Sequence, residues 1–494
     1  MSGGGRFLSM DVPSVARPGA YINFQSIPRP MIFIGERGTS AGLVEMSWYR
    51  DAEAVKVNGM DFLTGAALRH VGETAFGTSE TTKHISLLLS ACTDTIVMSA
   101  NTGGDKAKVT IPMTNGELIV EAQKQGEFGN NIYISVQPVP VVTGEPPQWS
   151  VLTIISGHAA LNIPNMTQTV TGPDALQNND FVTFSVTRDD PDVEPTLTPV
   201  AGVALEDGTN GITSLAARVS VFLRTMKNRT WQVMGWQWPD AAQKIIVQQF
   251  VQRMRDENGL YVQVAMSAEH ANHEAIINVD ESQGDAINPV TGEEFTIDEI
   301  ALMVASMSAG ADIITSNTNT PLPIQLEFSN ELENAEIIDG LQKGLFMFSR
   351  RRDGTLKVEQ DINSLHTFTP EKNREFRKNN ILRKLDEIGA TIRSTWENFF
   401  MGNEINDEIG RDLYMAQIDT YFTEMQRIRA LQNHGIDNLR IRQGNDPDAV
   451  VMAAIVQPTD AMERLFLTVN VDTGVYFAGE TGPDRDAIFA RAGF

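Results

Sequence analysis

The chain has 494 residues, 41% of them hydrophobic and 21% charged, a composition typical of a globular protein of roughly three domains. Its formal net charge of −24 argues against general binding to nucleic acid or to anionic membranes. No apolar run reaches the roughly 18–20 residues needed to span a bilayer, and a single cysteine, Cys92, excludes an intrachain disulfide.

Residues 1–30 predict an extended N-terminal arm. Glycine and proline flank one short run in which alternate residues point to opposite sides. The run comprises Ala20, Tyr21, Ile22, Asn23 and Phe24. Such a segment can add a strand to the sheet of another subunit, and a frayed terminus is the alternative.

Residues 31–104 and 203–355 predict the two parts of one central α/β domain. Helical and strand patterns alternate in both parts, which is typical of a mostly parallel sheet. The expected strands are 31–34, 95–98 and 261–265, and the expected helices are 81–91 and 240–258. The last helix should bury Ile245, Ile246, Phe250, Val251 and Met254.

Residues 105–202 predict an insertion of different character. This stretch is rich in Thr, Val, Pro and Gly, with short β-prone runs at 108–111, 132–136 and 182–186. The spacing of these runs favours a β-sandwich-like insertion domain between the two parts of the α/β domain.

Residues 356–464 predict an α+β C-terminal domain. Its first helix should begin with Thr369 as N-cap and Pro370 at the first helical position. A second helix should cover 407–433, and a strand 450–456. Residues 465–494 should form a C-terminal strand and arm, whose alternating run comprises Leu465, Phe466, Leu467, Thr468 and Val469.

Six basic residues gather between positions 371 and 384, against two acidic ones, inside a strongly acidic chain. They are Lys372, Arg374, Arg377, Lys378, Arg383 and Lys384. Several would lie in the first turns of the expected helix, where the helix dipole disfavours cations. We therefore predict a docking surface for an acidic neighbour, with a merely solvated helix face as the alternative.

Two patterns could suggest nucleophilic catalysis. Residues 38–41, Gly-Thr-Ser-Ala, mimic the serine motif of subtilisins, but that chemistry needs a histidine base and an orienting carboxylate, and no His-Gly-Thr-His sequence is present. Cys92 ends an apolar, helix-like run without an adjacent basic partner, which indicates a buried structural thiol. We expect no enzyme activity.

Two further patterns could suggest bound ions or nucleotides. His270, His273 and Glu274 are close in sequence, yet zinc needs three or four ligands with an oriented second shell, so a turn-capping or solvated role is favoured. The glycine-rich stretch 207–211 lacks the Lys-Ser/Thr of a phosphate loop and predicts a tight turn. We expect no cofactor and no metal.

The stretch 358–383 resembles the C-terminal block of contractile phage tail sheath proteins, in the branch found in Gram-positive myophages and defective prophages. Four other stretches resemble the same family in the expected order: 17–24, 103–107, 124–132 and 205–211. In the third of these, Gln125 stands where the family usually has proline. The joint order of these motifs, rather than any one of them, makes the resemblance specific.

The resemblance implies a subtilisin-like central domain without protease activity and a tube-proximal C-terminal domain. It also implies hexameric rings, stacked as a helical sheath around a tail tube in a metastable extended state, that contract to drive the tube through the host envelope. The expected partners are other copies of the chain, the tube protein, and baseplate and tail terminator proteins. The expected location is the virion tail, assembled in the host cytoplasm without membrane insertion. The alternatives are the sheath of a phage-like bacteriocin or contractile injection system and, distantly, an α/β hydrolase.

Overall fold

The computed structural model describes residues 38–49, 53–59, 80–140, 146–156, 165–267, 271–370 and 372–463. The chain divides into two compact units, Met1–Thr459 and Asp460–Phe494, and every described helix and strand lies in the first. The expected arms at 20–24 and 465–469, and the expected strand at 31–34, lie outside the described residues.

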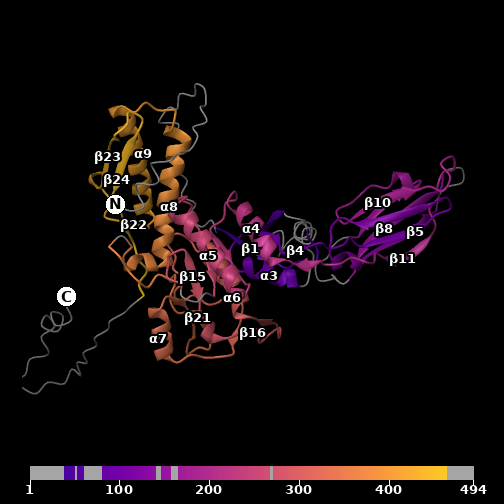
Figure 1. The fold of residues 1–494 in the computed structure, drawn as a ribbon, viewed down its shortest axis with the longest axis horizontal. Coiled ribbons are helices and arrows are strands. Elements are labelled where there is room, and N and C mark those ends of the chain that lie inside the picture. The colour runs from indigo at the N-terminus through magenta and orange to yellow at the C-terminus, as the bar shows by residue number, and fades with distance from the viewer. Residues whose placement is uncertain are drawn as a thin grey trace, which may run out of the picture. The chain divides into compact units, whose positions relative to one another are not determined.

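A seven-stranded sheet forms the centre of the first unit (Figure 1). In spatial order its strands are β19 (Leu345–Phe346), β15 (Ile276–Val279), β14 (Gln263–Met266), β13 (Val233–Gly235), β1 (Thr39–Val44), β3 (Asp94–Ser99) and β2 (Ala54–Asn58). All neighbours pair in parallel except β2, which runs antiparallel to β3. Since β1 pairs with both β3 and β13, strands from before and after the insertion build one sheet.

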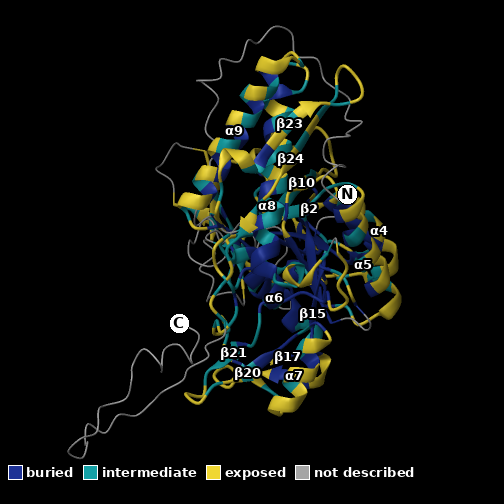
Figure 2. Ribbon diagram, turned by 90° about the vertical axis from the view of Figure 1, so that its left-hand side faces the viewer, coloured by how far each residue is buried: buried dark blue, intermediate teal, exposed yellow. Residues whose placement is uncertain are grey.

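Helices cover both faces of this sheet, because its strands are apolar on both sides. Helices α3 (Glu80–Leu88) and α6 (Ile297–Gly310) pack on one face, and α4 (Leu215–Met226) and α5 (Ala241–Asp256) on the other. Helix α6 is buried along most of its length (Figure 2). Among the helices that the structure describes, none combines the length and the apolar character that a membrane span requires.

Helix α5 begins as expected, with the Asp240 carboxylate accepting a hydrogen bond from the Gln243 backbone N–H. The expected burial of Ile245 and Ile246 is wrong, since these side chains are 53% and 44% exposed. The buried stripe instead runs from Val247 to Met254. Each residue turns the helix by about 100°, which places Ile245 roughly opposite that stripe and Ile246 at its edge, one turn before Phe250.

The insertion consists of two antiparallel sheets around one hydrophobic cluster. One sheet contains β5 (Lys108–Pro112), β6 (Glu117–Ala122) and β10 (Val182–Thr187); the other contains β7 (Ile132–Val139), β8 (Gln148–Ile155), β9 (Met166–Val170) and β11 (Val200–Ala204). Trp48, which follows β1, enters this cluster with its ring 4.9 Å from that of Phe128. Gly126 has φ +129°, and a Cβ there would lie 1.7 Å from the Ser47 carbonyl oxygen, so this turn requires glycine.

Short paired strands and one short helix complete the region around the central sheet. They are β4 (Asn101–Thr102), β12 (Ile212–Thr213), β16 (Ala286–Ile287), β17 (Glu294–Phe295), β18 (Glu327–Phe328), α7 (Asn334–Gln342), β20 (Phe348–Arg350) and β21 (Leu356–Val358). The antiparallel pairs are β4 with β12, β16 with both β17 and β18, and β20 with β21.

Two long helices, α8 (Asn379–Thr395) and α9 (Glu408–Arg427), dominate the C-terminal region. A π-helical turn, Trp396–Phe400, follows α8, and two antiparallel strand pairs follow α9. These pairs are β22 (Leu431–Gln432) with β25 (Gln457–Pro458), and β23 (Leu439–Gln443) with β24 (Val450–Ala454). The helices share a core with these strands.

The predicted limits of both helices need correction. Helix α8 begins at Asn379 rather than at 370, because Lys378 is extended and its neighbour Arg377 accepts a backbone hydrogen bond from Asn363. Thr369 caps only a local turn, in which its Oγ1 accepts from the Lys372 N–H. Helix α9 begins after its Asp407 N-cap as predicted, but it ends at 427 rather than 433, since Arg429 has φ +66°.

The partly buried Glu299 carboxylate ties α6 to α3. The Glu299 carboxylate accepts from Lys83 Nζ (3.0 Å), the Thr296 backbone N–H (2.9 Å) and His84 Nε2 (2.8 Å). Burial alone would raise the pKa of Glu299, but these hydrogen bonds outweigh it and hold the pKa at about 2.

Glu299→Gln should therefore lower the free energy of unfolding at pH 7 by about 1–3 kcal/mol. The folded-state pKa lies below the unfolded value of about 4.3. The carboxylate therefore contributes its full share of the unfolding free energy above about pH 4.3, and this contribution disappears as the pH falls toward 2. Urea unfolding of both proteins between pH 7 and pH 2 should show the difference shrinking in acid. An exposed control, Glu293→Gln, should show no such pH-dependent difference.

Candidate functional site at the seam between the central sheet and helix α8

The segment after β21 is hydrogen-bonded on two sides. The Ser364 backbone N–H donates to the Ile276 carbonyl of β15 (2.8 Å), and the Asn379 N–H of α8 donates to the Asp361 carbonyl (3.1 Å). Asp361, Asn363 and Ser364 are all buried although all are polar. We call the contacts of residues 361–386 with the central sheet and α5 the seam.

The Asp361 carboxylate is the centre of the seam. It accepts hydrogen bonds from the Asn317 backbone N–H (3.0 Å), Asn379 Nδ2 (3.0 Å) and Arg383 Nη2 (2.9 Å). Its side chain is fully buried, so these three donors replace the water that the charge loses. Because Asn379 and Arg383 belong to α8, the carboxylate fixes the first turns of that helix.

A second group of charges joins α5 to the C-terminal region. The Arg255 guanidinium makes a bidentate pair with Asp386 of α8, and its Nε lies 3.7 Å from Glu274 Oε1. Lys372 Nζ lies 2.6 Å from Glu274 Oε1 and 3.4 Å from Asp256 Oδ1. Burial alone would raise the pKa of Glu274, but His273, Lys372 and Arg255 outweigh it and lower the pKa.

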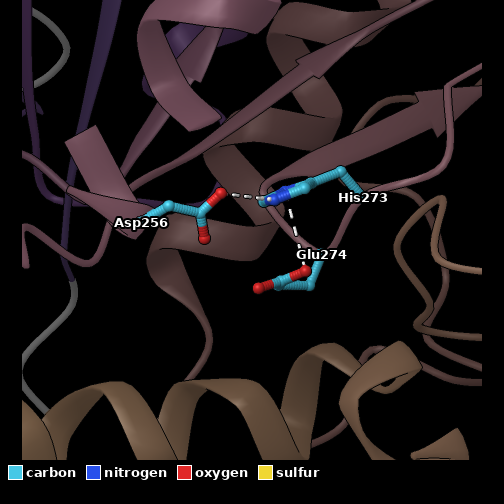
Figure 3. A group of neighbouring side chains, drawn as sticks. All are labelled: Asp256, His273 and Glu274. Carbon is cyan, nitrogen blue, oxygen red and sulfur yellow. Dashed lines mark hydrogen bonds and ion pairs between the residues drawn. The ribbon is translucent and has the colours of Figure 1, made fainter. Parts of the chain in front are cut away.

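His273 lies between the Asp256 and Glu274 carboxylates of this group (Figure 3). Its Nε2 is 3.1 Å from Asp256 Oδ2, and its Nδ1 accepts from the Ala275 backbone N–H (3.0 Å) and lies 3.6 Å from Glu274 Oε2. Burial lowers the pKa of His273, partly offset by the neighbouring carboxylates.

One ligand atom each of Asp256, His273 and Glu274 lies within 4.8 Å of the others, but three ligands fall short of the usual set of a structural zinc site. The Lys372 ammonium already bridges Asp256 and Glu274. His270, the third residue of the sequence pattern, lies outside the described residues.

The seam contains half of the basic cluster that the sequence predicted to be a docking surface. Lys372 pairs with Glu274, Arg383 binds Asp361 and the Thr315 carbonyl, and the buried Lys384 donates to Asn380 Oδ1 and the Thr459 carbonyl. These partners lie within the chain, so the three cations are not free surface charges. The argument from the helix dipole also fails for Lys372, Arg374 and Arg377, because they precede α8.

The other half of the cluster is exposed at least in part, although the Nε and Nη2 atoms of Arg377 are buried. Arg374 is exposed, and Arg377 and Lys378 are partly exposed. Burial and the nearby Arg374 charge lower the pKa of Arg377. A docking role for Arg374, Arg377 and Lys378 stays a prediction.

The nucleophile candidates are inside the protein. Ser40 lies in β1 and is fully buried, and its Oγ lies 2.8 Å from the Leu88 carbonyl oxygen and 2.9 Å from Thr95 Oγ1. Cys92 is buried as expected, with its thiol against the Leu88 carbonyl (2.9 Å). These contacts are structural, and neither side chain faces a histidine among the described contacts.

Side chains also link the strand ends at the place where a doubly wound sheet usually binds ligands. The strand order reverses between β1 and β13, and the carboxyl ends of the strands at such a point commonly bind ligands. Here Gln237 Nε2 and Trp238 Nε1 both donate to the Leu43 carbonyl, at 2.9 and 2.8 Å. The stretch 207–211 forms a turn in which the Gly208 N–H donates to Asn130 Oδ1 (2.8 Å).

Comparison with known proteins identifies the class of protein to which this fold and seam belong. Residues 206–364 match the phage tail sheath protein central domain, and residues 371–472 match the phage tail sheath C-terminal domain. The two matches together cover more than half of the chain and meet at the seam. The chain belongs to the tail sheath family, whose members are structural proteins and not enzymes.

Individual relatives agree with this assignment over nearly the whole chain. The phage-like element PBSX protein XkdK of Bacillus subtilis is 28% identical, covering 92% of this chain and 97% of its own. The crystal structure of a sheath tail protein from Desulfitobacterium hafniense has a TM-score of 0.72 at 27% identity, covering 92% of this chain and all of its own. The helical sheath of the anti-feeding prophage in its contracted state shares the fold, with a TM-score of 0.51, 10% identity, and coverage of 93% and 100%.

Replacing the central carboxylate should disrupt the seam. Asp361→Asn removes the charge that Arg383 requires and should cost about 3–5 kcal/mol of unfolding free energy, the range for breaking a buried ion pair. Urea unfolding measures the loss. Asp353→Asn, at an exposed hairpin position, is the matched control. Equal unfolding midpoints for the two variants would contradict the central role of Asp361.

Proposed function

We propose that the chain is the subunit of a contractile sheath, stacked as hexameric rings around a tail tube in an extended state that contracts to drive the tube through the host envelope. The observation that carries the proposal is the ordered match of both sheath domains on the two regions that the seam joins. Partners would be the tube, baseplate and tail terminator proteins, with assembly in the host cytoplasm. The boundaries at 104, 202, 355 and 464, and the subtilisin-like and sandwich-like descriptions, are part of this proposal.

The seam supports a mechanical role. Buried polar networks are costly to break because each group would lose its partner without regaining water. The hydrogen bonds of Asp361, Arg255 and Ser364 across the seam therefore favour a subunit whose central and C-terminal regions move together. Energy for contraction would then be stored in the packing between subunits rather than in the seam.

Strand addition would link neighbouring subunits. The alternating runs at 20–24 and 465–469 would each pair with the sheet of a neighbour. A suitable acceptor is the β23–β24 pair, which among the described residues is a two-stranded sheet with no further strand on either edge. Sheets of two strands gain most from a third strand, because they are only marginally stable alone.

The accessible basic residues would dock an acidic neighbour, either the tube or the adjacent sheath subunit. Arg374, Arg377 and Lys378 lie on the surface of a chain that carries −24 overall. Local complementarity of this kind would offset the repulsion between like-charged subunits. The sheath of a phage-like bacteriocin or injection system would use the same surfaces, and neighbouring genes would distinguish these settings.

Self-assembly is the test of the proposed function. The purified full-length protein should polymerise without tube protein into long hollow tubes, because the contracted lattice is the stable state of a metastable sheath. Electron microscopy and light scattering would detect the tubes. A protein that stays monomeric at high concentration would contradict the proposal.

Removing either arm should prevent assembly while leaving the subunit folded. Deleting residues 1–26, or all residues after Glu463, removes one alternating run in each case. Light scattering should then show no tubes, whereas circular dichroism and the thermal midpoint should stay close to those of the full-length monomer. Normal polymerisation of both truncated proteins would show that strand addition is not the link.

Reversing the accessible charges should weaken docking. The triple variant Arg374→Glu, Arg377→Glu, Lys378→Glu should lose co-assembly with the tube protein and show a weaker salt dependence, since exposed charges are screened over about 8–10 Å. Each pair contributes only about 0.2–1 kcal/mol, so single reversals should be mild, while repetition along a polymer multiplies the effect. The matched control reverses the exposed Arg224, Lys227 and Arg229 of the α4 end. Equal co-assembly of both triple variants across a salt series would show that the basic cluster is only a solvated surface without a docking role.

A further inference from the structure

The three-stranded sheet of β17, β16 and β18 has one buried and one exposed side. Successive residues of a strand point to opposite sides, so the paired residues form two rows. The inner row packs into the core and consists of Ala286, Phe295 and Phe328. The outer row is exposed and consists of Glu294, Ile287 and Glu327.

The exposed side is apolar at its centre. Ile287 is 40% exposed, and Val290, in the turn between β16 and β17, is 76% exposed. This turn is ordered, since Asn288 Oδ1 accepts a hydrogen bond from the Val290 backbone N–H (2.9 Å). We call Ile287, Val290, Glu294 and Glu327 the β16 face. A surface that is already ordered loses little conformational entropy on binding, which favours a docking role.

The carboxylates of the β16 face lack cations within the chain. No Lys or Arg occurs between residues 256 and 342, and a more buried acid of this stretch, Glu299, takes its cation, Lys83, from another segment. Among the described contacts, neither Glu294 nor Glu327 has an ion pair. Neighbouring strands are about 4.8 Å apart, so the two outer strands lie roughly 10 Å apart with the isoleucine between them. A basic side chain laid over that isoleucine would approach both carboxylates.

The exposed part of the basic cluster has the complementary pattern. Arg374 is exposed, and Arg377 and Lys378 are partly exposed; we call these three residues the basic surface. Phe376, between the two arginines in the chain, is partly exposed, and Phe368, earlier in the same segment, is 41% exposed. Aromatic groups flanked by cations thus match an apolar centre flanked by carboxylates.

The two surfaces lie at opposite ends of strand β15. At its amino end, the Ser364 N–H donates to the Ile276 carbonyl and the adjacent Asn363 N–H donates to the Arg377 carbonyl, which places the basic surface there. The strands of the β16 face follow its carboxyl end at Val279. A strand of four residues is about 13 Å long, so the two surfaces meet between copies rather than within one. A contact between two different patches of identical chains is head-to-tail, and such contacts build rings or helical filaments.

We propose that the basic surface of one subunit docks on the β16 face of a second copy. The arginine stems cover Ile287 and their guanidinium groups pair with Glu294 and Glu327, while the neighbouring aromatic side chains cover Val290. The inference rests on the proposed function and deepens it, since it selects the adjacent sheath subunit, rather than the tube, as the partner of the basic surface.

Charge reversal on each side, without tube protein, tests this contact. One variant carries Arg374→Glu and Arg377→Glu, and the other carries Glu294→Lys and Glu327→Lys. Each should raise the protein concentration at which tubes form by about three- to thirtyfold, as measured by light scattering. An equimolar mixture of the two variants should restore assembly, because each then supplies the charge that the other lacks.

The control reverses two exposed acids of the insertion, Glu117→Lys and Asp192→Lys, and should assemble like the wild type. Normal assembly of either test variant, or no rescue in the mixture, would overturn the proposed contact while wild-type tubes still supported the sheath. Absence of tubes in the wild type would instead contradict the proposed function.

Cysteine cross-linking tests the same contact without requiring tubes, since the natural Cys92 is buried. A mixture of Arg374→Cys chains with Glu294→Cys chains should form a disulfide-linked dimer on mild oxidation, in greater yield than either variant alone. A mixture of Arg374→Cys chains with Glu117→Cys chains should not. Equal yields from the two mixtures would overturn the proposed contact.

Discussion

The buried Asp361 carboxylate is the contact on which the arrangement of the C-terminal region depends. A carboxylate without water is stable only if donors surround it, and its donors come from the loop at Asn317 and from Asn379 and Arg383 of α8. The same segment continues the edge of the central sheet through Ser364. Loss of the carboxylate would therefore strand a guanidinium in the interior and release the start of α8 at the same time.

The elements that the sequence predicted well are those that local pattern determines. Strands such as β3 and β10, the starts of α5 and α9, and the burial of Cys92 follow from periodicity or from neighbours within a few residues. The start of α8 does not, because a proline at 370 is a good first helical residue, yet pairing of 377–379 with the distant segment 361–363 keeps the chain extended. Tertiary hydrogen bonds here override a sound local signal.

The basic cluster shows why charge spacing alone could not reveal the seam. A net positive stretch predicts a charged neighbour, but for Lys372 and Arg383 the acidic partners are Glu274 and Asp361 of the same chain rather than of another protein. The pair between Arg255 and Asp386 joins residues 131 positions apart. No local pattern indicates such a pair, whereas the run of short polar residues after β21 was a usable signal because buried polar segments need partners.

A seam of this kind suits a protein that must move without unfolding. Surface ion pairs exchange readily with water, so they can break and re-form between subunits at little cost. Buried pairs such as Arg255 with Asp386 cannot, since each charge would be left in a medium of low polarity. The ion pairs that are costly to break thus lie inside the subunit, whereas Arg374 and its partly exposed neighbours lie on the surface. Under the proposed function, contraction would break and re-form the surface ion pairs between subunits and leave the buried ion pairs within each subunit intact.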